Sequence, residues 1–268
     1  TFDFGDFFAS RIIQMIEKYK ITTFCAPPTV YRILVHMDLN KFDLSSLQNV
    51  TTAGEALNPE IYEKFYQMTG LKIMEGFGQS ETTMIIGNVC GMEPRPGSMG
   101  RPNPQYQVST MRPDGTLCDT KETGEIVIHV EPQSPIGLFL GYYEDETRTD
   151  STIYNGYYHT GDTAYIDEDG FLWYVGRVDD VIKSTGYRVG PFEVENEIMK
   201  LPYVLECAVT AVPDPIRGQV VKAFIVLVKG QHGSEEMKKE IQNYVKHHTA
   251  PYKYPRKIEF LEALPKTS

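Results

Sequence analysis

The sequence predicts a mixed fold: an α/β sheet with a β-rich subdomain, followed by a smaller α+β domain. Three observations support this prediction. Strand-like and helix-like stretches alternate up to about residue 77, short strands separated by turns follow from about residue 105, and two helices flank two apolar strands beyond residue 177. Strand–helix alternation indicates parallel pairing, whereas short strands joined by turns indicate a β-rich unit. With 268 residues, 41% of them hydrophobic, the chain can bury at least one full core.

The first two regions follow these periodicities in chain order. Helices are predicted at about 6–19, 29–37 and 59–69, and apolar strands at 21–28, 47–54 and 71–77. In the β-rich region, strands are predicted in "GEIVIHV" (124–130) and "GFLWYVGR" (170–177), with turns in "PDG" and "DEDG".

The third region begins at a predicted hinge. The stretch "GRVDD" (176–180) contains a glycine and two carboxylates with little apolar content, which suits a joint between moving bodies. After it we predict a helix in "PFEVENEIMK", strands in "LECAVTAV" and "QVVKAFIVLV", and a helix at 234–247 that buries Met237, Ile241, Tyr244 and Val245. The predicted domains are therefore 1–177 and 178–268, with the hinge near Asp179.

Composition excludes several classes of partner. A net charge of −10 argues against nucleic acid or an anionic membrane as the main partner, because both are held through clustered Lys and Arg. The four cysteines are far apart and indicate neither a zinc site nor a disulfide framework, and no apolar run reaches the roughly 20 residues of a membrane span. Small-molecule substrates are expected, and a homodimer is left open.

The chain begins at "TFDFGD" without an initiator Met and ends at "LEALPKTS", inside an ordered-looking motif. We therefore expect it to be part of a longer protein. A reduced compartment fits the cysteines, so a cytoplasmic location is expected, or the mitochondrial matrix if the source is eukaryotic.

The first candidate site is "EGFGQSETT" (75–83), a polar run at the end of a predicted strand, where α/β sheets place ligand sites. Gly76 and Gly78 leave room beside the backbone, Ser80 can donate to phosphate or carboxylate oxygens, and Glu81 could help to coordinate Mg²⁺ beside a nucleotide. A polar surface turn is a reasonable alternative explanation of the run.

Two further stretches suggest a nucleotide. Gly54 in "TTAGEAL" follows a strand and would let a flat ligand approach the backbone, although routine strand-to-helix turns explain it better. Asp162, in a predicted acidic loop, could accept hydrogen bonds from a ribose diol, and a hairpin could bring Arg177 back near it. Taken alone, this pair is more simply a surface salt bridge.

Two basic stretches lie in the third region. "VIKSTGYRVGPFEVE" (181–195) places Arg188 in a predicted glycine-containing loop before a helix, where it could pair with a phosphate, although a turn and helix cap explain the stretch too. "TAPYKYPRKIEF" (249–260) clusters Lys253, Arg256 and Lys257, which suggests a polyphosphate ligand or an edge strand protected by lysines.

The stretch "MIIGNVCGM" (84–92) is a candidate apolar pocket. Its side chains Met84, Ile85, Ile86 and Val89 could wall an apolar cavity. They could equally pack a buried helix.

In this order and spacing, the motifs resemble the adenylate-forming acyl-CoA synthetase superfamily, and within it the medium-chain acyl-CoA synthetases. The strings that carry the resemblance are "APPTVYRIL", "GFGQSET", "SPIGLFLGYY", "GRVDDVIKSTGYRVGPFEVEN", "PDPIRGQVVKAFIVL" and "TAPYKYPRKIEF…LPKT". They extend over essentially the whole chain. With this resemblance, Met84, Ile85, Ile86 and Val89 become the expected walls of an acyl pocket for a medium-length or small aromatic acid.

The resemblance implies a ligase that forms acyl-AMP and pyrophosphate from a carboxylate and ATP, and then transfers the acyl group to coenzyme A. It implies that Glu81 helps to hold Mg²⁺. The residues expected to serve the reaction are Glu81, Arg188 and Ser80, and Ser80 stands where the family usually has Thr. The ATP and AMP site would comprise Gly54, Glu55, Ala56, Glu75, Gly76, Phe77, Gly78, Gln79, Ser80, Asp162 and Arg177.

The resemblance also implies a small domain that turns about Asp179 between the two half-reactions. Residues expected to contact coenzyme A are Thr185, Gly186, Tyr187, Arg217, Pro255, Arg256 and Lys257. The family's phosphate loop would precede residue 1 and its catalytic lysine would follow Ser268, so we expect the 268-residue stretch alone to be inactive. Two alternatives are an adenylation domain that loads a carrier protein and a degenerate nucleotide-binding homologue.

Overall fold

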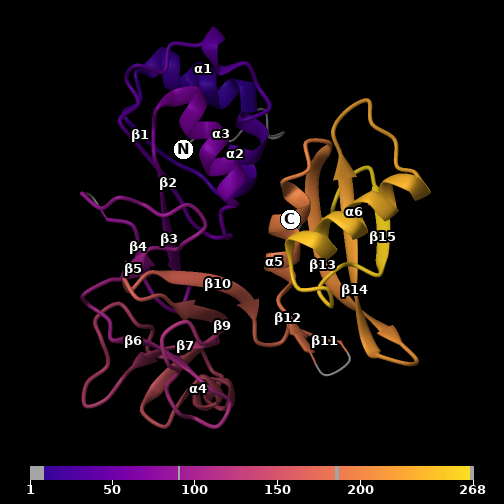
Figure 1. The fold of residues 1–268 in the computed structure, drawn as a ribbon. Helices are drawn as coiled ribbons and strands as arrows, with labels where there is room; N and C mark the ends of the chain where they lie inside the picture. The colour runs from indigo at the N-terminus through magenta and orange to yellow at the C-terminus, as the bar shows by residue number, and fades with distance from the viewer. Residues whose placement is uncertain (1–8, 90, 185–186, 266–268) are drawn as a thin grey trace.

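A computed structural model describes residues 9–89, 91–184 and 187–265 of the chain. Three sheets, each with its own hydrophobic core, make up the molecule. Figure 1 shows the first two stacked one above the other and the third standing beside them. We call them the first, second and third bodies.

The first body is the predicted α/β unit. Its sheet has the order β1-β2-β3-β4-β5, with β1, β2 and β3 parallel and β4 and β5 added antiparallel. The strands are β1 (Thr23–Cys25), β2 (Asn49–Thr52), β3 (Ile73–Gly78), β4 (Met84–Gly87) and β5 (Arg101–Pro102), and the helices are α1 (Ala9–Tyr19), α2 (Pro28–Leu34), η1 (Leu39–Lys41) and α3 (Pro59–Thr69). The alternation is therefore confirmed, whereas the buried helix considered for 84–92 is wrong, because 84–87 form a strand.

Local sequence explains where these helices start and stop. Prolines occupy the first turn of both α2 and α3, where a missing N–H costs nothing, and Gly70 ends α3 in the left-handed conformation at φ 71°. In the core, the Tyr31 and Phe65 rings meet edge to face with centroids 5.2 Å apart. This packing fixes α2 against α3 and holds the strand ends in place.

The second body is an antiparallel sheet with the order β10-β9-β7-β6, and β8 pairs with β9. Its elements are β6 (Val108–Met111), β7 (Gly124–His129), α4 (Glu146–Thr152), β8 (Ile153–Tyr154), β9 (Tyr157–Ile166) and β10 (Leu172–Arg177). The predicted hairpin is present, and Asp162 is the register partner of Arg177 across it. Asp162 itself lies within β9, so the acidic loop predicted around it is wrong.

The third body is richer in strands than predicted. Its elements are β11 (Ile182–Ser184), β12 (Tyr187–Val189), α5 (Pro191–Met199), β13 (Val204–Asp214), β14 (Gly218–Leu227), α6 (Glu235–His248) and β15 (Lys257–Leu261). The sheet order is β12-β11-β14-β13, and β15 pairs parallel to β14 at the edge. The two helices and two long strands are confirmed. The predicted loop at Arg188 is wrong, because this residue lies in β12.

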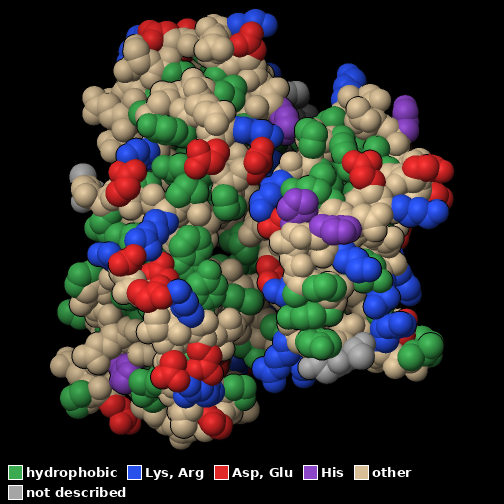
Figure 2. Space-filling view, viewed as in Figure 1, with side chains coloured by type: hydrophobic (Ala, Val, Ile, Leu, Met, Phe, Trp, Pro, Cys, Tyr) green, Lys and Arg blue, Asp and Glu red, His purple; other side chains and the backbone are tan. Residues whose placement is uncertain are grey.

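The second and third bodies are joined by residues 178–181, between the end of β10 and the start of β11. The predicted boundary at 177/178 falls in this connection and stays a prediction. The side-chain amide of Asn58, on the first body, donates to Oδ1 of Asn196, on the third body. The Tyr174 ring of the second body and the Phe192 ring of the third meet with centroids 5.5 Å apart. A groove follows the seam between the third body and the other two on the face shown in Figure 2. None of the described helices is long and apolar enough to cross a bilayer.

Candidate active site

A cavity of about 300 Å³ lies between the end of β3 and the strands β9 and β10. We call it the strand-end cavity. It brings together ten of the eleven residues predicted to bind nucleotide: Gly54, Glu55, Ala56, Glu75, Gly76, Phe77, Gly78, Gln79, Asp162 and Arg177. Ser80, which is exposed, is not among the lining residues. Met99 and Tyr174 also line the cavity, and sequence reasoning missed both.

Asp162 is the centre of a hydrogen-bond network in this cavity. Gln79 Nε2 donates to Asp162 Oδ2 at 2.6 Å and to the Thr160 carbonyl at 2.9 Å, and Gln79 Oε1 accepts from the Tyr158 hydroxyl at 2.7 Å. The Tyr174 hydroxyl donates to Asp162 Oδ1 at 3.2 Å. The side chain of Gln79 therefore fastens the β3 loop to β9.

Asp162 and Arg177 do form the ion pair that we considered from the sequence, with Arg177 Nη1 4.0 Å from Asp162 Oδ1. The pair is not on the surface at the Asp162 side, because Asp162 is only 5% exposed. Burial raises the pKa of Asp162, and the Arg177 charge and the hydrogen bonds from Tyr174 and Gln79 oppose that shift. The result is a buried acceptor of fixed orientation, with lone pairs left for a ligand diol.

The glycines of the β3 loop have a structural reason for their identity. A Cβ on Gly78 would lie 2.3 Å from the Thr83 carbonyl oxygen, and one on Gly76 would lie 2.8 Å from Met84 Sδ. The close packing of β3 against β4 thus requires glycine at 78 whether or not a ligand binds. Gly54 differs, because it has φ 92° with open space where a Cβ would point.

Glu75 has the most strongly shifted carboxyl group of the strand-end cavity. It is 6% exposed, and its Oε1 accepts from the Leu57 amide at 3.2 Å. Burial raises the pKa of Glu75 to about 8, and the Leu57 hydrogen bond offsets this shift only in part. Glu75 is therefore a protonated carboxyl group at neutral pH.

Substituting Glu75 by glutamine should change how stability depends on pH. Because the pKa is about 8 when folded and near 4.5 when unfolded, the folded state holds the proton more tightly. The free energy of unfolding of the wild-type protein therefore falls as pH rises from about 4.5 to about 8. Between pH 6 and pH 8.5, Glu75→Gln should gain roughly 2–3 kcal/mol over wild type, or about 5–10 °C in the thermal midpoint.

Thermal unfolding of the complete protein at these two pH values would measure this gain. Glu63→Gln, at an exposed position on α3, is the control and should show no such gain. A gap between Glu75→Gln and wild type that stays constant with pH would contradict the prediction.

Glu81 lies next to the strand-end cavity and is held by the segment that follows β7. The Tyr142 hydroxyl donates to Glu81 Oε1 at 2.8 Å, and the Phe139 amide donates to the Glu81 carbonyl at 2.7 Å. Glu81 and Tyr142 line a cavity of about 680 Å³, which shares Gln79 and Arg177 with the strand-end cavity. We call it the Glu81 cavity.

The side chains near Glu81 suit a Mg²⁺ ion that is bound mainly by the phosphates of a nucleotide. They do not suit a site built from protein ligands alone. Among the described residues, no three His, Cys, Asp or Glu side chains are grouped to hold a metal. Mg²⁺ is usually bound by one or two carboxylates together with substrate phosphates and water. Glu81, with one oxygen held by Tyr142, can supply one such carboxylate.

An apolar cavity of about 600 Å³ opens on the other side of β3. Met84 and Val89 line it, together with Met74, Phe77 and Cys25. Two of the four predicted acyl-pocket residues thus face this cavity. Ile85 and Ile86 do not, because both are completely buried in the core of the second body.

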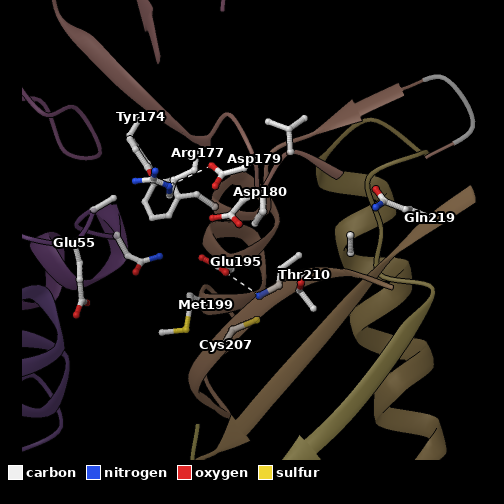
Figure 3. Close-up of a pocket in the computed structure, with 18 of the residues that line it drawn as sticks. Glu55, Tyr174, Arg177, Asp179, Asp180, Glu195, Met199, Cys207, Thr210 and Gln219 are labelled. Carbon is white, nitrogen blue, oxygen red and sulfur yellow. Dashed lines mark hydrogen bonds and ion pairs between the residues drawn. The ribbon is translucent and has the colours of Figure 1, made fainter. Parts of the chain in front are cut away.

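The seam between the first and third bodies contains a cavity of about 460 Å³, shown in Figure 3. We call it the interbody cavity. Glu55, Ala56, Tyr174 and Arg177 line both this cavity and the strand-end cavity. The Glu55 carboxylate accepts from Thr29 Oγ1 at 2.9 Å. Asp179, the predicted hinge residue, is exposed and accepts from Arg177 Nε at 3.3 Å.

Glu195 is a half-buried acid that lines the interbody cavity. Its Oε1 accepts from the Val209 amide at 2.8 Å, as Figure 3 shows. Burial raises the pKa of Glu195, and this hydrogen bond and the charge of Arg32 on the first body oppose the shift. An electrostatic interaction therefore links the first and third bodies.

Of the residues predicted to contact coenzyme A, the five that the structure describes line none of the cavities named in this section. Thr185 and Gly186 lie outside the described residues. The Tyr187 ring stacks on Tyr252 at 4.1 Å, and Arg217 lies 3.8 Å from Asp214.

Three neighbouring residues of this predicted set follow α6 and lead into β15. Pro255 is buried and its carbonyl accepts from Gln242, whereas Arg256 and Lys257 are exposed. The Arg256 guanidinium donates to the Tyr254 hydroxyl at 2.7 Å. Arg188 lines a separate cavity of about 610 Å³ beside Lys183 and Lys253.

Comparison with known protein families identifies the class. Residues 2–143 match the family described as "AMP-binding enzyme", and residues 193–268 match "AMP-binding enzyme C-terminal domain". The first match alone covers more than half of the chain. This chain belongs to the AMP-binding enzyme family.

Individual relatives make the resemblance to acyl-CoA synthetases specific. The mitochondrial acyl-coenzyme A synthetase ACSM3 of Rattus norvegicus is 49% identical over 263 residues, which are 97% of this chain and 45% of the relative. The resemblance inferred from the sequence is thus confirmed. The chain spans about half the length of the relatives it matches.

Solved structures confirm the fold class. An anthranilate CoA ligase, AuaEII, in complex with anthranoyl-AMP superposes with a TM-score of 0.89 at 34% identity, over 97% of this chain and 49% of that one. ATP-bound MatB from Rhodopseudomonas palustris superposes with a TM-score of 0.88 at 25% identity, over 99% of this chain and 52% of that one.

Proposed function

We propose that the complete protein containing this chain is an AMP-forming acyl-CoA synthetase. In the first step, a carboxylate oxygen attacks the α-phosphorus of ATP, which forms the acyl-AMP anhydride and releases pyrophosphate. In the second, the thiol of coenzyme A attacks the acyl carbon, AMP leaves, and the thiol proton passes to solvent. The observation that carries the proposal is the strand-end cavity, which collects ten of the eleven residues expected to bind ATP.

The chain's own residues take distinct roles in this proposal. Asp162 accepts hydrogen bonds from the ribose hydroxyls, and Arg177 lies on the ribose side of the nucleotide. The Glu75 carboxyl group lines the cavity beside the glycine backbone that contacts adenine. Ser80 contributes a donor hydroxyl near the α-phosphate. Glu81 contributes a carboxylate to Mg²⁺, which when bound offsets the negative charge of the phosphates.

The apolar cavity supports an uncharged acyl group of moderate size. Met74, Phe77, Met84 and Val89 provide flexible or flat apolar walls for it. We therefore propose a medium-chain, branched or small aromatic acid as substrate. The similar protein AuaEII, an anthranilate CoA ligase, is itself named for an aromatic acid.

The third body supplies the coenzyme A site and moves about Asp179 in this proposal. The large domain would be 1–177 and the small mobile domain 178–268. Asp179 is exposed, in a four-residue connection between two strands, which suits a hinge. Arg188 would approach the reacting phosphate, and Thr185, Gly186, Tyr187, Arg217, Pro255, Arg256 and Lys257 would contact coenzyme A. We propose a mitochondrial matrix location for a eukaryotic source and otherwise a cytoplasmic one; the rat relative is itself named as mitochondrial.

Carboxylate-dependent exchange between ATP and labelled pyrophosphate tests the first step. The complete protein would be assayed with straight-chain acids, benzoate-like acids and amino acids, and exchange driven by fatty or aromatic acids is expected. Exchange with amino acids alone would favour a carrier-loading adenylation domain, and no exchange would favour a degenerate nucleotide-binding homologue. The 268-residue stretch alone should show no acid-dependent AMP release.

Substituting Arg256 by alanine should weaken the binding of coenzyme A and leave the binding of ATP unchanged. Arg256 is an exposed cation, so its contact with a phosphate should be worth about 1 kcal/mol, or a 5- to 10-fold rise in the KM for coenzyme A. Pyrophosphate exchange should be unchanged, because ATP binds elsewhere. Lys229→Ala removes an exposed cation from the same body as a control. An equal effect of the two substitutions on coenzyme A would refute the assignment of Arg256.

A further inference from the structure

Glu81 is fastened by one short segment at two points. The Phe139 amide donates to its backbone carbonyl, and the Tyr142 hydroxyl donates to its carboxylate oxygen Oε1, at 2.7 and 2.8 Å. Backbone and side chain of Glu81 are therefore positioned by residues some sixty positions later in the chain. The second carboxylate oxygen is not held by this contact.

Tyr142 is itself held in place on several sides. Its backbone amide donates to Thr149 Oγ1 on α4 at 2.9 Å, and the Arg148 guanidinium of the same helix lies 4.0 Å from the centre of its ring. The Phe139 ring meets it edge to face at 4.9 Å. Together these contacts hold the backbone and ring of Tyr142 while its hydroxyl donates to Glu81.

The same segment reaches the Asp162 network. The Phe139 ring packs against Tyr158 at 5.7 Å, and the Tyr158 hydroxyl donates to Gln79, which in turn donates to Asp162. Contiguous contacts thus run from the carboxylate expected at the phosphates to the carboxylate expected at the ribose. The contacts of this segment therefore connect two carboxylates of the candidate site, in addition to anchoring the segment itself.

We propose that Tyr142 is a positioning residue: its hydroxyl fixes the orientation of the Glu81 carboxylate, so that the other oxygen is presented to the divalent cation that accompanies ATP. The inference rests on the proposed function. Rotation about the terminal bond of a glutamate is soft, and Mg²⁺ demands near-octahedral geometry, so an unfixed carboxylate would bind the cation less well. Outer contacts of this kind typically contribute 10- to 100-fold to metal affinity.

The test is Tyr142→Phe in the complete protein. This variant keeps the ring that Arg148 and Phe139 contact and removes only the hydroxyl. Calorimetric titration of ATP, with and without Mg²⁺, would measure how much the cation strengthens binding. We expect that gain to fall about 10-fold while metal-free ATP affinity stays the same. In pyrophosphate exchange, the Mg²⁺ concentration for half-maximal rate should rise by a similar factor, with little loss at saturating Mg²⁺.

The neighbouring tyrosine provides a matched control, because Tyr143 is 90% exposed. Tyr143→Phe should leave the Mg²⁺ dependence unchanged. A Tyr142→Phe protein that is folded and shows the wild-type Mg²⁺ dependence would overturn the inference and leave Tyr142 as a loop anchor only.

A second variant covers the case in which Tyr142→Phe does not fold. Arg148→Met removes the charge above the ring and keeps the hydroxyl, and it should raise the Mg²⁺ requirement by a smaller factor, about 2- to 3-fold. An unchanged requirement would count against the inference. If the wild-type protein supports no exchange with any acid, the proposed function fails, and the calorimetric Mg²⁺ effect still decides the role of Tyr142.

Discussion

Replacing Gln79 by glutamate is expected to weaken AMP binding to the complete protein by about 100-fold. Gln79 Nε2 donates to Asp162 Oδ2 at 2.6 Å, so a glutamate would face that carboxylate with an oxygen. Losing a charge-assisted hydrogen bond and placing two carboxylates together costs about 3 kcal/mol, even with partial screening. That free energy corresponds to about two powers of ten in affinity.

Calorimetric titration of AMP would measure the loss. The loss should be smaller at pH 6 than at pH 8, because two facing carboxyl groups can share a proton at lower pH. Gln105→Glu adds the same charge at an exposed turn of the second body and should leave AMP affinity within 2-fold. A loss of less than 3-fold with Gln79→Glu would mean that Asp162 does not bind the nucleotide.

Replacing Gly100 by alanine should prevent stable folding. Gly100 has φ 104°, and a Cβ there would lie 2.2 Å from the Gly87 carbonyl carbon and 2.6 Å from the Asn88 nitrogen. These neighbours are backbone atoms that cannot swing away. Gly100 also joins the first and second bodies, because its carbonyl accepts from the Leu172 amide at 2.8 Å. We expect a loss of more than about 4 kcal/mol, from strain and overlap together.

Gly115→Ala separates the two causes of that loss. Gly115 has φ 85° with open space around the position of a Cβ, so alanine there meets the backbone strain without the overlap. It should cost about 1–2 kcal/mol and lower the thermal midpoint by a few degrees. Similar soluble yield and midpoint for the two variants would show that the overlap at Gly100 is relieved by backbone movement.

The sequence was sufficient to predict elements with strong periodicity. α3 has the predicted bounds, and the hairpin that pairs Asp162 with Arg177 forms as expected. Short strands were missed, because the three residues of β11 or of β12 carry too little pattern to be distinguished from a turn. β15 differs, because an edge strand protected by lysines was the alternative interpretation of residues 249–260, and Lys257 is the first residue of β15.

The lining of the strand-end cavity could be predicted where residue type and position coincide with a motif. Asp162 and Gln79 were both named, yet their burial and mutual hydrogen bond depend on how β3 meets β9, which no local pattern states. Tyr174 was missed although it lies three residues before Arg177 on the same strand. Tyr142 was missed because its partner Glu81 is 61 positions away, although "GYY" lies within a string that carries the family resemblance.

The interbody cavity and the strand-end cavity share Glu55, Ala56, Tyr174 and Arg177 as a common wall. A ligand that displaces this wall from one side necessarily reshapes the other side, without any relay of intervening residues. Thermodynamic linkage then requires the effect to be reciprocal. By whatever factor a ligand in the interbody cavity strengthens nucleotide binding, nucleotide binding must strengthen the binding of that ligand by the same factor.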